Sequence, residues 1–479
     1  MSKKETSNFM DFSVLNKYNQ EISAIDMGQS QRFNVNRQQI KQALDGNDVV
    51  QLRKFSQYFY QTSGAYKQLV DYLGTLLTFD HVLVPRLDEE QYESTGFKRA
   101  YKNVKKYLAK STIKQDSSDM VRKMVRDGCY FGYERELNGT YSFQHLPAGF
   151  CRSRFKIMGV YAVEFDYSYF RQFAGKEIQE VIEAFPAEMQ AGYQEYLNNA
   201  QENRWQLLNP TYARAHMLEQ AAPPLSAVFL DLLDYEAAKD KAKIKESLDI
   251  YKLIVQKINL DDEGKLTFQL PEIKQFHENL RKAVKNSNID VVTTPFSVEG
   301  LDIQDKFQNN KDNVERAKDT IYSTAGTSAI LFNAGAQANS RAIEESIKTD
   351  ESILLPLLHQ FEKWYKNRLA AIAPRFEFEL HFPPITQRNR KNMFEMYSQA
   401  ASYGYPTKLL ALASMGLAQD NAEYLLRYEN DYLGLAEKMI PTQSAHTSSG
   451  SDKGGAPTKD TDELSEEGVK TRDKGGSSQ

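Results

Sequence analysis

Apolar residues recur at helical spacing along much of the chain, and one well-defined stripe lies near its start. The stripe consists of Tyr66, Leu69, Val70, Leu73, Leu76 and Leu77, which fall at i, i+3, i+4, i+7, i+10 and i+11. The helical pattern begins at Asp48, a favourable N-cap residue, and is interrupted at Ser63-Gly64. We predict that the helix stops near Phe79 and that residues 81–84 form a short strand.

Two hairpin signals follow. Asn138-Gly139 supplies the positive φ angles that a two-residue hairpin turn needs, and Met158-Gly159 occupies the same place in a second strand pair. The first half is therefore predicted to be α+β, with an antiparallel sheet enclosed between helices. Its predicted segments after the first strand are helices at 97–108 and 120–125, strands at 129–137, 140–146, 150–157 and 160–165, and helix at 176–200.

The second half is mainly helical in pattern. Pro223-Pro224 marks a boundary, and the helix predicted after it carries dense charge of both signs, typical of a helix exposed over much of its surface. Pro356 should kink a later helix, because proline cannot donate to the carbonyl of Ser352. The predicted segments are helix at 225–253, a turn at 261–264, helix at 272–284, an extended run at 289–294, helices at 310–323 and 341–373, a strand at 376–382, and two or three helices within 388–438, broken at 404–406 and 416.

Composition narrows the possible classes of protein. The chain of 479 residues is 41% hydrophobic and 26% charged, with a net charge of only −4, which argues against a protein that wraps nucleic acid with its whole surface. No apolar run reaches the length of a membrane span, and the N-terminus lacks a secretory signal pattern. Two cysteines, Cys129 and Cys151, cannot build a disulfide framework, so a reducing cytoplasm is the expected setting.

Catalytic motifs are missing from the sequence. It has no phosphate-binding glycine loop, no dinucleotide fingerprint and no metalloprotease or serine-hydrolase motif, so we predict no enzyme, no cofactor and no metal site. Cys129 is interpreted as a small buried hydrophobe and the acidic turn Asp261-Asp262-Glu263 as a solvated tip. The acidic pairs Glu344-Glu345 and Asp350-Glu351 are interpreted as acids favoured by the dipole of the helix that they open.

Four stretches, taken in order, resemble one protein family. They are 53–73 closing at 82–85, the charged helix after Pro223-Pro224, the small-residue stretch Ser323-Thr324-Ala325-Gly326-Thr327 with Leu331-Phe332-Asn333, and Gly404-Tyr405-Pro406 through Tyr428-Glu429-Asn430-Asp431. Their succession over 48–440 resembles the portal, or head-to-tail connector, proteins of tailed bacteriophages.

The resemblance implies an α+β, mainly helical subunit of a cyclic ring with wing, stem, clip and crown parts. The expected parts are a weakly structured N-terminal arm (1–47), a wing (48–222), a first stem helix (225–256), a clip (257–308), a second stem helix (309–323), a tunnel-loop region (324–340), a long kinked helix with a returning wing strand (341–387), a crown (388–440) and a disordered tail (441–479).

The resemblance also implies which residues line the DNA tunnel. Amide and hydroxyl groups make weak, replaceable contacts with a DNA backbone, as expected of Asn333, Gln337, Asn339 and Ser340. Without the resemblance, an ordinary connection between helices is the favoured explanation of this loop. Four basic residues are candidates either for lumen charge or for inter-subunit salt bridges: Arg341, Lys311, Arg316 and Lys318. The basic cluster Arg388, Arg390 and Lys391 is interpreted as a solvated helix start that invites a partner.

The expected function is a non-enzymatic conduit for double-stranded DNA at one capsid vertex, made in the host cytoplasm and carried in the virion. Its expected partners are about eleven further copies of itself, non-specifically held DNA, the terminase large subunit, the major capsid and scaffolding proteins, and a head-completion or tail adaptor protein, with no membrane. The alternative is an intracellular helical scaffold or adaptor without a channel, which charge-patterned helices also permit.

Overall fold

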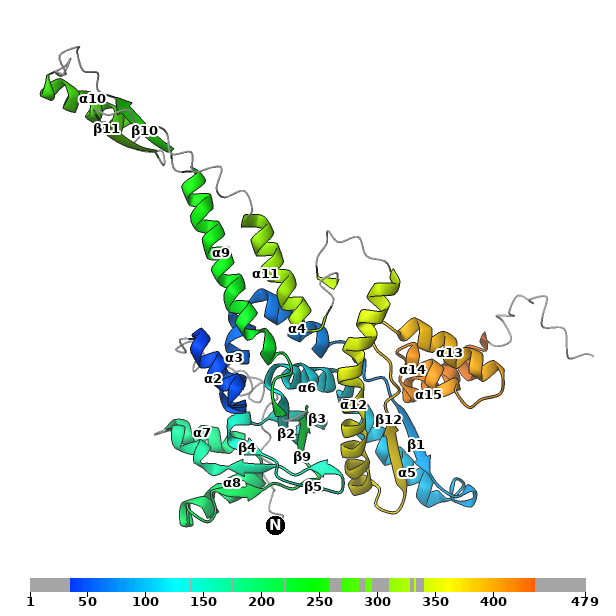
Figure 1. Ribbon diagram of the computed structural model, residues 1–479. Coiled ribbons are helices and arrows are strands. Elements are labelled where there is room, and N and C mark those ends of the chain that lie inside the picture. Colours follow the sequence, from blue (N-terminus) through cyan, green and yellow to red (C-terminus); the bar gives the residue numbers. More distant parts are fainter. Residues whose placement is uncertain are drawn as a thin grey trace, which may run out of the picture. The chain divides into compact units, whose positions relative to one another are not determined.

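The computed structural model is an α+β chain in which helices predominate (Figure 1). The structure describes residues 35–137, 139–173, 176–218, 221–250, 252–257, 269–283, 289–294, 310–327, 331–332 and 340–435. The chain divides into two units, the first ending at Asp420 and the second beginning at Asn421.

Three helices open the described chain: α2 (Arg37–Asp45), α3 (Val49–Thr62) and α4 (Gly64–Gly74). The predicted cap is confirmed, because the Asp48 side chain accepts from the Gln51 N–H. The prediction of a weakly structured arm is wrong where α2 lies, since Asn36 and Gln39 form a reciprocal capping box. Ile40 and Ala43 are buried on α2, whereas residues 1–34 lie outside the described part.

Helices α5 (Thr95–Ala109) and α6 (Ile113–Asp127) confirm the two predicted stripes, and strand β1 (Val82–Arg86) pairs antiparallel with β12 (Glu377–His381). The prediction that the helix stops near Phe79 is wrong, because α4 already ends at Gly74. The chain turns between α4 and β1 at Phe79, whose φ of 52° is unusual for a bulky residue. The Phe79 ring packs 4.9 Å from that of Phe361, and this burial holds the strained turn in place.

The predicted hairpin at Asn138-Gly139 is confirmed by strands β2 (Cys129–Leu137) and β3 (Thr140–His145), with Gly139 at a φ of 77°. The third strand of this sheet is β9 (Ala213–Met217), which pairs antiparallel with β2 and which the sequence patterns did not predict. Alternation along β2 divides the interior into two clusters. Tyr130 faces the helical core, whereas Cys129, Phe131 and Tyr133 face the second cluster.

The second cluster lies among short strands and helices. The hairpin at Met158-Gly159 is confirmed, but its strands are broken into shorter pieces than predicted. The helix predicted at 176–200 is divided into two helices in the structure, because Pro186 precedes the second. The elements are β4 (Cys151–Arg152), β5 (Lys156–Ile157), β6 (Val160–Tyr161), β7 (Glu164–Asp166), α7 (Lys176–Ala184), α8 (Ala187–Asn198) and β8 (Trp205–Leu207). Short 3₁₀ helices lie at Glu89–Gln91, Ala148–Phe150, Tyr167–Gln172 and Ser226–Val228.

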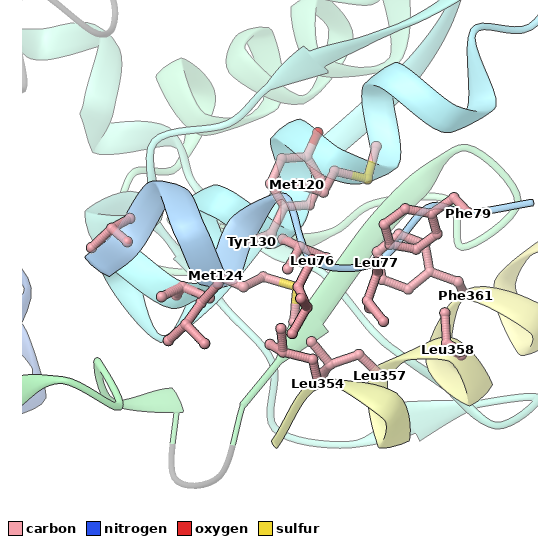
Figure 2. Close-up of a cluster of buried hydrophobic side chains, with 14 of the residues drawn as sticks. Leu76, Leu77, Phe79, Met120, Met124, Tyr130, Leu354, Leu357, Leu358 and Phe361 are labelled. Atoms are coloured by element: carbon pink, nitrogen blue, oxygen red, sulfur yellow. The ribbon is translucent and has the colours of Figure 1, made fainter. Parts of the chain in front are cut away.

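Helix α12 (Ser340–Ile372) runs through the main core and contains Pro356, as predicted. The backbone stays helical on both sides of Pro356, and the kink itself stays a prediction. Figure 2 shows apolar side chains from α12 meeting those of the α4–β1 connection, α6 and β2. They are Leu354, Leu357, Leu358 and Phe361 from α12, with Leu76, Leu77, Phe79, Met120, Met124 and Tyr130.

A buried guanidinium fastens α12 to the central sheet. Arg214 of β9 is 0% exposed, and its Nε donates to His216 Nε2 at 2.6 Å. Burial and the Arg214 charge lower the pKa of His216, which keeps that imidazole neutral and able to accept. The guanidinium also lies within 5.0 Å of the centroids of four rings: Phe143, Phe361, Trp364 and Tyr365.

Helix α9 (Phe229–Ile250) and helix α11 (Asn310–Thr324) pack side by side (Figure 1). Between them in sequence, strands β10 (Lys252–Lys257) and β11 (Ile289–Thr294) pair in parallel around helix α10 (Leu270–Ala283). The prediction that helix continues to Leu253, or to 256 in the expected stem, is wrong. The run Leu253-Ile254-Val255 favours a strand and finds a partner in β11, far along the chain.

The final helices follow the predicted breaks. They are α13 (Arg390–Ser402), α14 (Lys408–Ser414) and α15 (Gln419–Arg427), with a π-helical turn at Tyr428–Tyr432. Gly404 and Gly416, with φ values of 89° and 85°, supply the left-handed backbone between them. The predicted disordered tail, 441–479, lies outside the described residues.

Replacing Arg214 tests the attachment of α12 to the sheet. Arg214→Ala removes four ring contacts and leaves the His216 Nε2 without its donor, so we expect a loss of about 3 kcal/mol in the free energy of unfolding. Arg214→Met keeps the apolar volume and should lose less. Chemical denaturation followed by circular dichroism measures both variants, and equal stability of Arg214→Ala and the unmodified chain would contradict this role.

Candidate functional site

The candidate site is the α9–α11 helix pair with the residues that hold the chain on either side of 333–339. The pair is fixed to the core at one end by Phe229, the first residue of α9. The Phe229 ring stacks on Phe59 with centroids 5.4 Å apart, and it meets the edges of Tyr66 and Phe55 at 5.7 and 6.4 Å. Four aromatic rings from three helices therefore form the base of the pair.

Beyond this base, the burial of the two helices changes. Leu232 on α9 and Ile321 and Tyr322 on α11 are fully buried. Further from the base, α9 presents exposed Lys239, Asp240, Lys241 and Lys243. The predicted exposure of this charged helix is confirmed over the described residues, and Arg37 on α2 forms an ion pair with Asp234 at 2.6 Å.

The segment that leaves α11 is held against the core by aromatic contacts. The ring of Phe332 stacks on Tyr322, with centroids 4.6 Å apart and planes within 8°. The Tyr72 ring of α4 meets Phe332 edge-on at 5.4 Å. The hydroxyl of Tyr322 donates to Gln68 Oε1 at 3.4 Å, so α4 contacts both the end of α11 and Phe332, which lies beyond that end.

Tyr72 of α4 also contacts the chain after 333–339. The Tyr72 hydroxyl donates to the Asp350 carboxylate of α12 at 2.9 Å. Asp350 is 1% exposed, and burial raises its pKa to about 6, opposed by the Tyr72 hydrogen bond and assisted by the nearby Glu351 charge. One side chain of α4 therefore contacts the chain before and after the 333–339 segment.

The helix-dipole interpretation of Asp350-Glu351 is wrong. Ser340 begins α12, so both acids lie beyond its first turns, and both are buried. Glu351 accepts from the Thr386 hydroxyl at 2.5 Å. The sequence signal that was missed is the position of these acids within an apolar stripe, where a buried acid needs a hydrogen-bond donor.

The predicted tunnel residues fall into three groups. Asn333, Gln337 and Asn339 lie outside the described residues, and Ser340 and Arg341 begin α12. Lys311 lies in the first turn of α11. Arg316 is exposed on α11, whereas the Lys318 ammonium lies 5.8 Å above the Tyr322 ring and so shares in the packing at the base.

The basic cluster at the start of α13 has a partner within the chain. Arg390 donates to the buried Asp80 carboxylate at 2.7 Å, and Lys114 binds the other oxygen of Asp80 at 2.5 Å. Lys114 also donates to the Gly416 carbonyl at 3.0 Å. The interpretation of a solvated helix start is therefore wrong for Arg390, whose partner was invisible to local patterns because it lies 310 residues away.

Chemical candidates were also sought among the described residues. Cys129 is buried, as predicted, and burial raises the pKa of its thiol to about 12, which does not favour a thiolate nucleophile. Within the described ranges, no group of three or more histidine, cysteine, aspartate or glutamate side chains could hold a metal ion. The helices described here include none long and apolar enough to cross a membrane.

Comparison with known proteins gives no assignment. No protein-family model matches the chain, and no curated protein matches it.

Tyr72→Phe separates the two contacts of Tyr72. The variant keeps the ring beside Phe332 but leaves the buried Asp350 without its donor, so we expect the free energy of unfolding to fall by about 1–3 kcal/mol. Faster amide exchange of α12 around Asp350 should accompany the loss. Tyr58→Phe on α3 is the matched control, and a Tyr72→Phe variant with unchanged exchange would show that this hydrogen bond does not hold α12.

Asp350 should make stability depend on pH. Its folded pKa of about 6 lies above the usual 3.8, so the folded state binds the proton more tightly. The stabilising contribution is present at low pH and is lost as pH rises from about 4 through 6. Asp350→Asn should remove that decline, with Asp240→Asn as an exposed control. Urea denaturation at several pH values measures it, and parallel pH curves for Asp350→Asn and the unmodified chain would contradict the assignment.

Proposed function

We propose that the chain is the subunit of a bacteriophage portal, a closed ring around a channel for double-stranded DNA. The observation that carries the proposal is the α9–α11 pair. It is anchored by aromatic rings at one end and carries exposed charge beyond that end. The paired strands β10 and β11, with α10, lie between its two helices in sequence. Such a pair suits a stem, in which one face packs on neighbouring copies and another borders water.

The remaining elements support the same order of parts. In this proposal α3 to β9 form the wing, and α9 and α11 form the stem. The β10–α10–β11 unit forms the clip, while α12 with β12 returns to the wing and α13 to α15 form the crown. The ring contains about twelve subunits joined by heterologous contacts that close.

The proposed channel requires contacts that do not trap DNA. A subunit with a net charge of −4 gives a ring that does not adhere strongly to phosphates along its whole wall. Arg316, exposed on α11, and the small polar residues of 333–340 supply local contacts that read no sequence. Tyr72 contacts the chain before and after 333–339, through Phe332 and Asp350.

The partners follow from this placement in a virion. The clip binds the terminase large subunit during packaging and later a head-completion or tail adaptor protein. Major capsid and scaffolding proteins contact the ring at the capsid vertex. The energy for DNA movement comes from ATP hydrolysis by the terminase, which agrees with the missing phosphate-binding glycine loop in this sequence.

Particle mass tests the proposal. The purified full-length chain should assemble into particles of roughly 660 kDa, about twelve times the 54.9 kDa chain, as measured by mass photometry. Double-stranded DNA longer than the particle should be retained when it is threaded and capped at both ends. A protein that stays monomeric or dimeric at micromolar concentration, with or without divalent cation, contradicts the portal and favours the scaffold alternative.

A further inference from the structure

Helix α5 and the residues after it carry charge of one sign. Between Glu93 and Asp116 the chain has no acidic residue and seven basic ones: Lys98, Arg99, Lys102, Lys105, Lys106, Lys110 and Lys114. The exposed part of α9 differs, because Lys239, Asp240 and Lys241 alternate there in sign. A surface that serves only solubility usually mixes both signs, so solubility alone does not explain the single sign on α5.

Several of these cations share the face of α5 that points away from the core. The opposite face is the buried one, and its buried residues are Phe97, Val104 and Tyr107. At 3.6 residues per turn, a single arc of about 100° on the outer side holds four exposed cations. They are Lys98, Arg99, Lys102 and Lys106. Lys98 pairs with Glu93 at 2.8 Å, so the name α5 basic face is kept here for Arg99, Lys102 and Lys106.

The charge of the α5 basic face is not compensated. Within the described ranges, no carboxylate forms an ion pair with Arg99, Lys102 or Lys106. These three cations stand at i, i+3 and i, i+4 spacing, where like charges destabilise a helix. The helix dipole favours a cation in the last turn, which accounts for Lys106 but not for Arg99 or Lys102. An anionic ligand along this face would remove the repulsion.

The buried side of α5 fixes the basic face in place. Near the start of the helix, the Phe97 ring stacks on Phe378 of β12, with centroids 5.9 Å apart and planes within 13°. Near its end, the Tyr107 hydroxyl donates to the buried Glu134 carboxylate of β2 at 2.5 Å. Because the helix is attached near both ends, its cations are presented on a rigid element, and little backbone ordering is needed when a ligand binds.

The composition of the outer face favours a phosphate backbone over an acidic protein. Protein interfaces rely on buried aromatic and aliphatic anchors, and lysine is depleted in them. Along 95–109, which the structure describes throughout, none of the exposed side chains is large and apolar. The exposed side chains beside the cations include Thr95 and Asn103, and both types commonly donate to phosphate and sugar oxygens.

We propose that the α5 basic face binds the phosphate backbone of double-stranded DNA without reading its sequence. Arg99 and Lys106 are separated by about 10 Å along the helix axis, which is close to the rise of three successive phosphates of one strand. Each bound cation releases counterions from the DNA, so the affinity depends on salt. The site lies within one chain and does not need a closed ring, so it goes beyond the proposed channel.

Neutralising the α5 basic face tests the proposal with full-length protein. The variant is Arg99→Gln with Lys102→Gln and Lys106→Gln, and the probe is a covalently closed circle of double-stranded DNA, which cannot be threaded through a channel. At about 50 mM salt, the affinity for the circle should fall at least about tenfold. The slope of log affinity against log salt should become shallower by about three, roughly one for each cation removed. Electrophoretic mobility shift over a salt series measures both.

The matched control is Lys41→Gln with Lys67→Gln and Arg171→Gln, which removes the same charge from exposed residues of three other elements. Its affinity for the circle should stay within about twofold of the unmodified chain. Circular dichroism confirms folding of both variants. An equal loss in the two variants would mean that overall charge alone holds the DNA, and it would overturn the proposal.

Two further outcomes count against the site. An unmodified chain that does not bind the circle at about 50 mM salt overturns it. Polyglutamate is the second probe, and a neutralised variant that loses polyglutamate but keeps the circle shows that the face takes an acidic protein instead. Because particle mass is measured separately, none of these outcomes decides whether the chain forms a portal ring.

Discussion

Burial of Phe229 among Phe59, Phe55 and Tyr66 is the interaction on which the candidate stem depends. A helix that carries exposed charge over much of its length cannot be held by its own outer surface. It must be fixed where it enters the core. Phe229 does this for α9, and Ile321 and Tyr322 do it for α11, so two segments far apart in sequence leave the same core side by side.

Helix α4 extends this anchoring to the chain around 333–339. Its Gln68 and Tyr72 contact Tyr322, Phe332 and Asp350, which belong to three successive parts of the sequence. Helix α12 is held a second time where its aromatic residues surround Arg214 of β9.

Sequence patterns correctly predicted the helices, caps and turns that depend on neighbouring residues in the chain. The helical stripe from Tyr66 to Leu73, the cap at Asp48 and the hairpin at Gly139 each depend on residues close together in sequence, and all three are present. Leu76 and Leu77 are buried as well, but they lie beyond the end of α4. Capping also explains α2, whose Asn36–Gln39 box was overlooked because the surrounding segment is polar. The signal was available from spacing alone.

The errors share a different cause, which is a partner distant in sequence. The charged pattern alone predicted that the helix continues through the residues of β10. Pairing with β11 makes them a strand. Arg390 and Asp350 are residue types that usually lie on protein surfaces. Their partners, Asp80 and Tyr72, are brought beside them only by the fold. The candidate site shows the same limit, because the role of Tyr72 follows only from the meeting of α4, Phe332 and α12, which no local pattern contains.

Imaging of the assembled protein by cryo-electron microscopy tests the central claim most directly. A portal predicts a closed ring with an axial opening wide enough for a double helix, about 20 Å or more, bordered by the α9–α11 pairs of successive copies. A solitary chain, a compact assembly without an opening, or a ring in which these helices lie on the outer wall would contradict it.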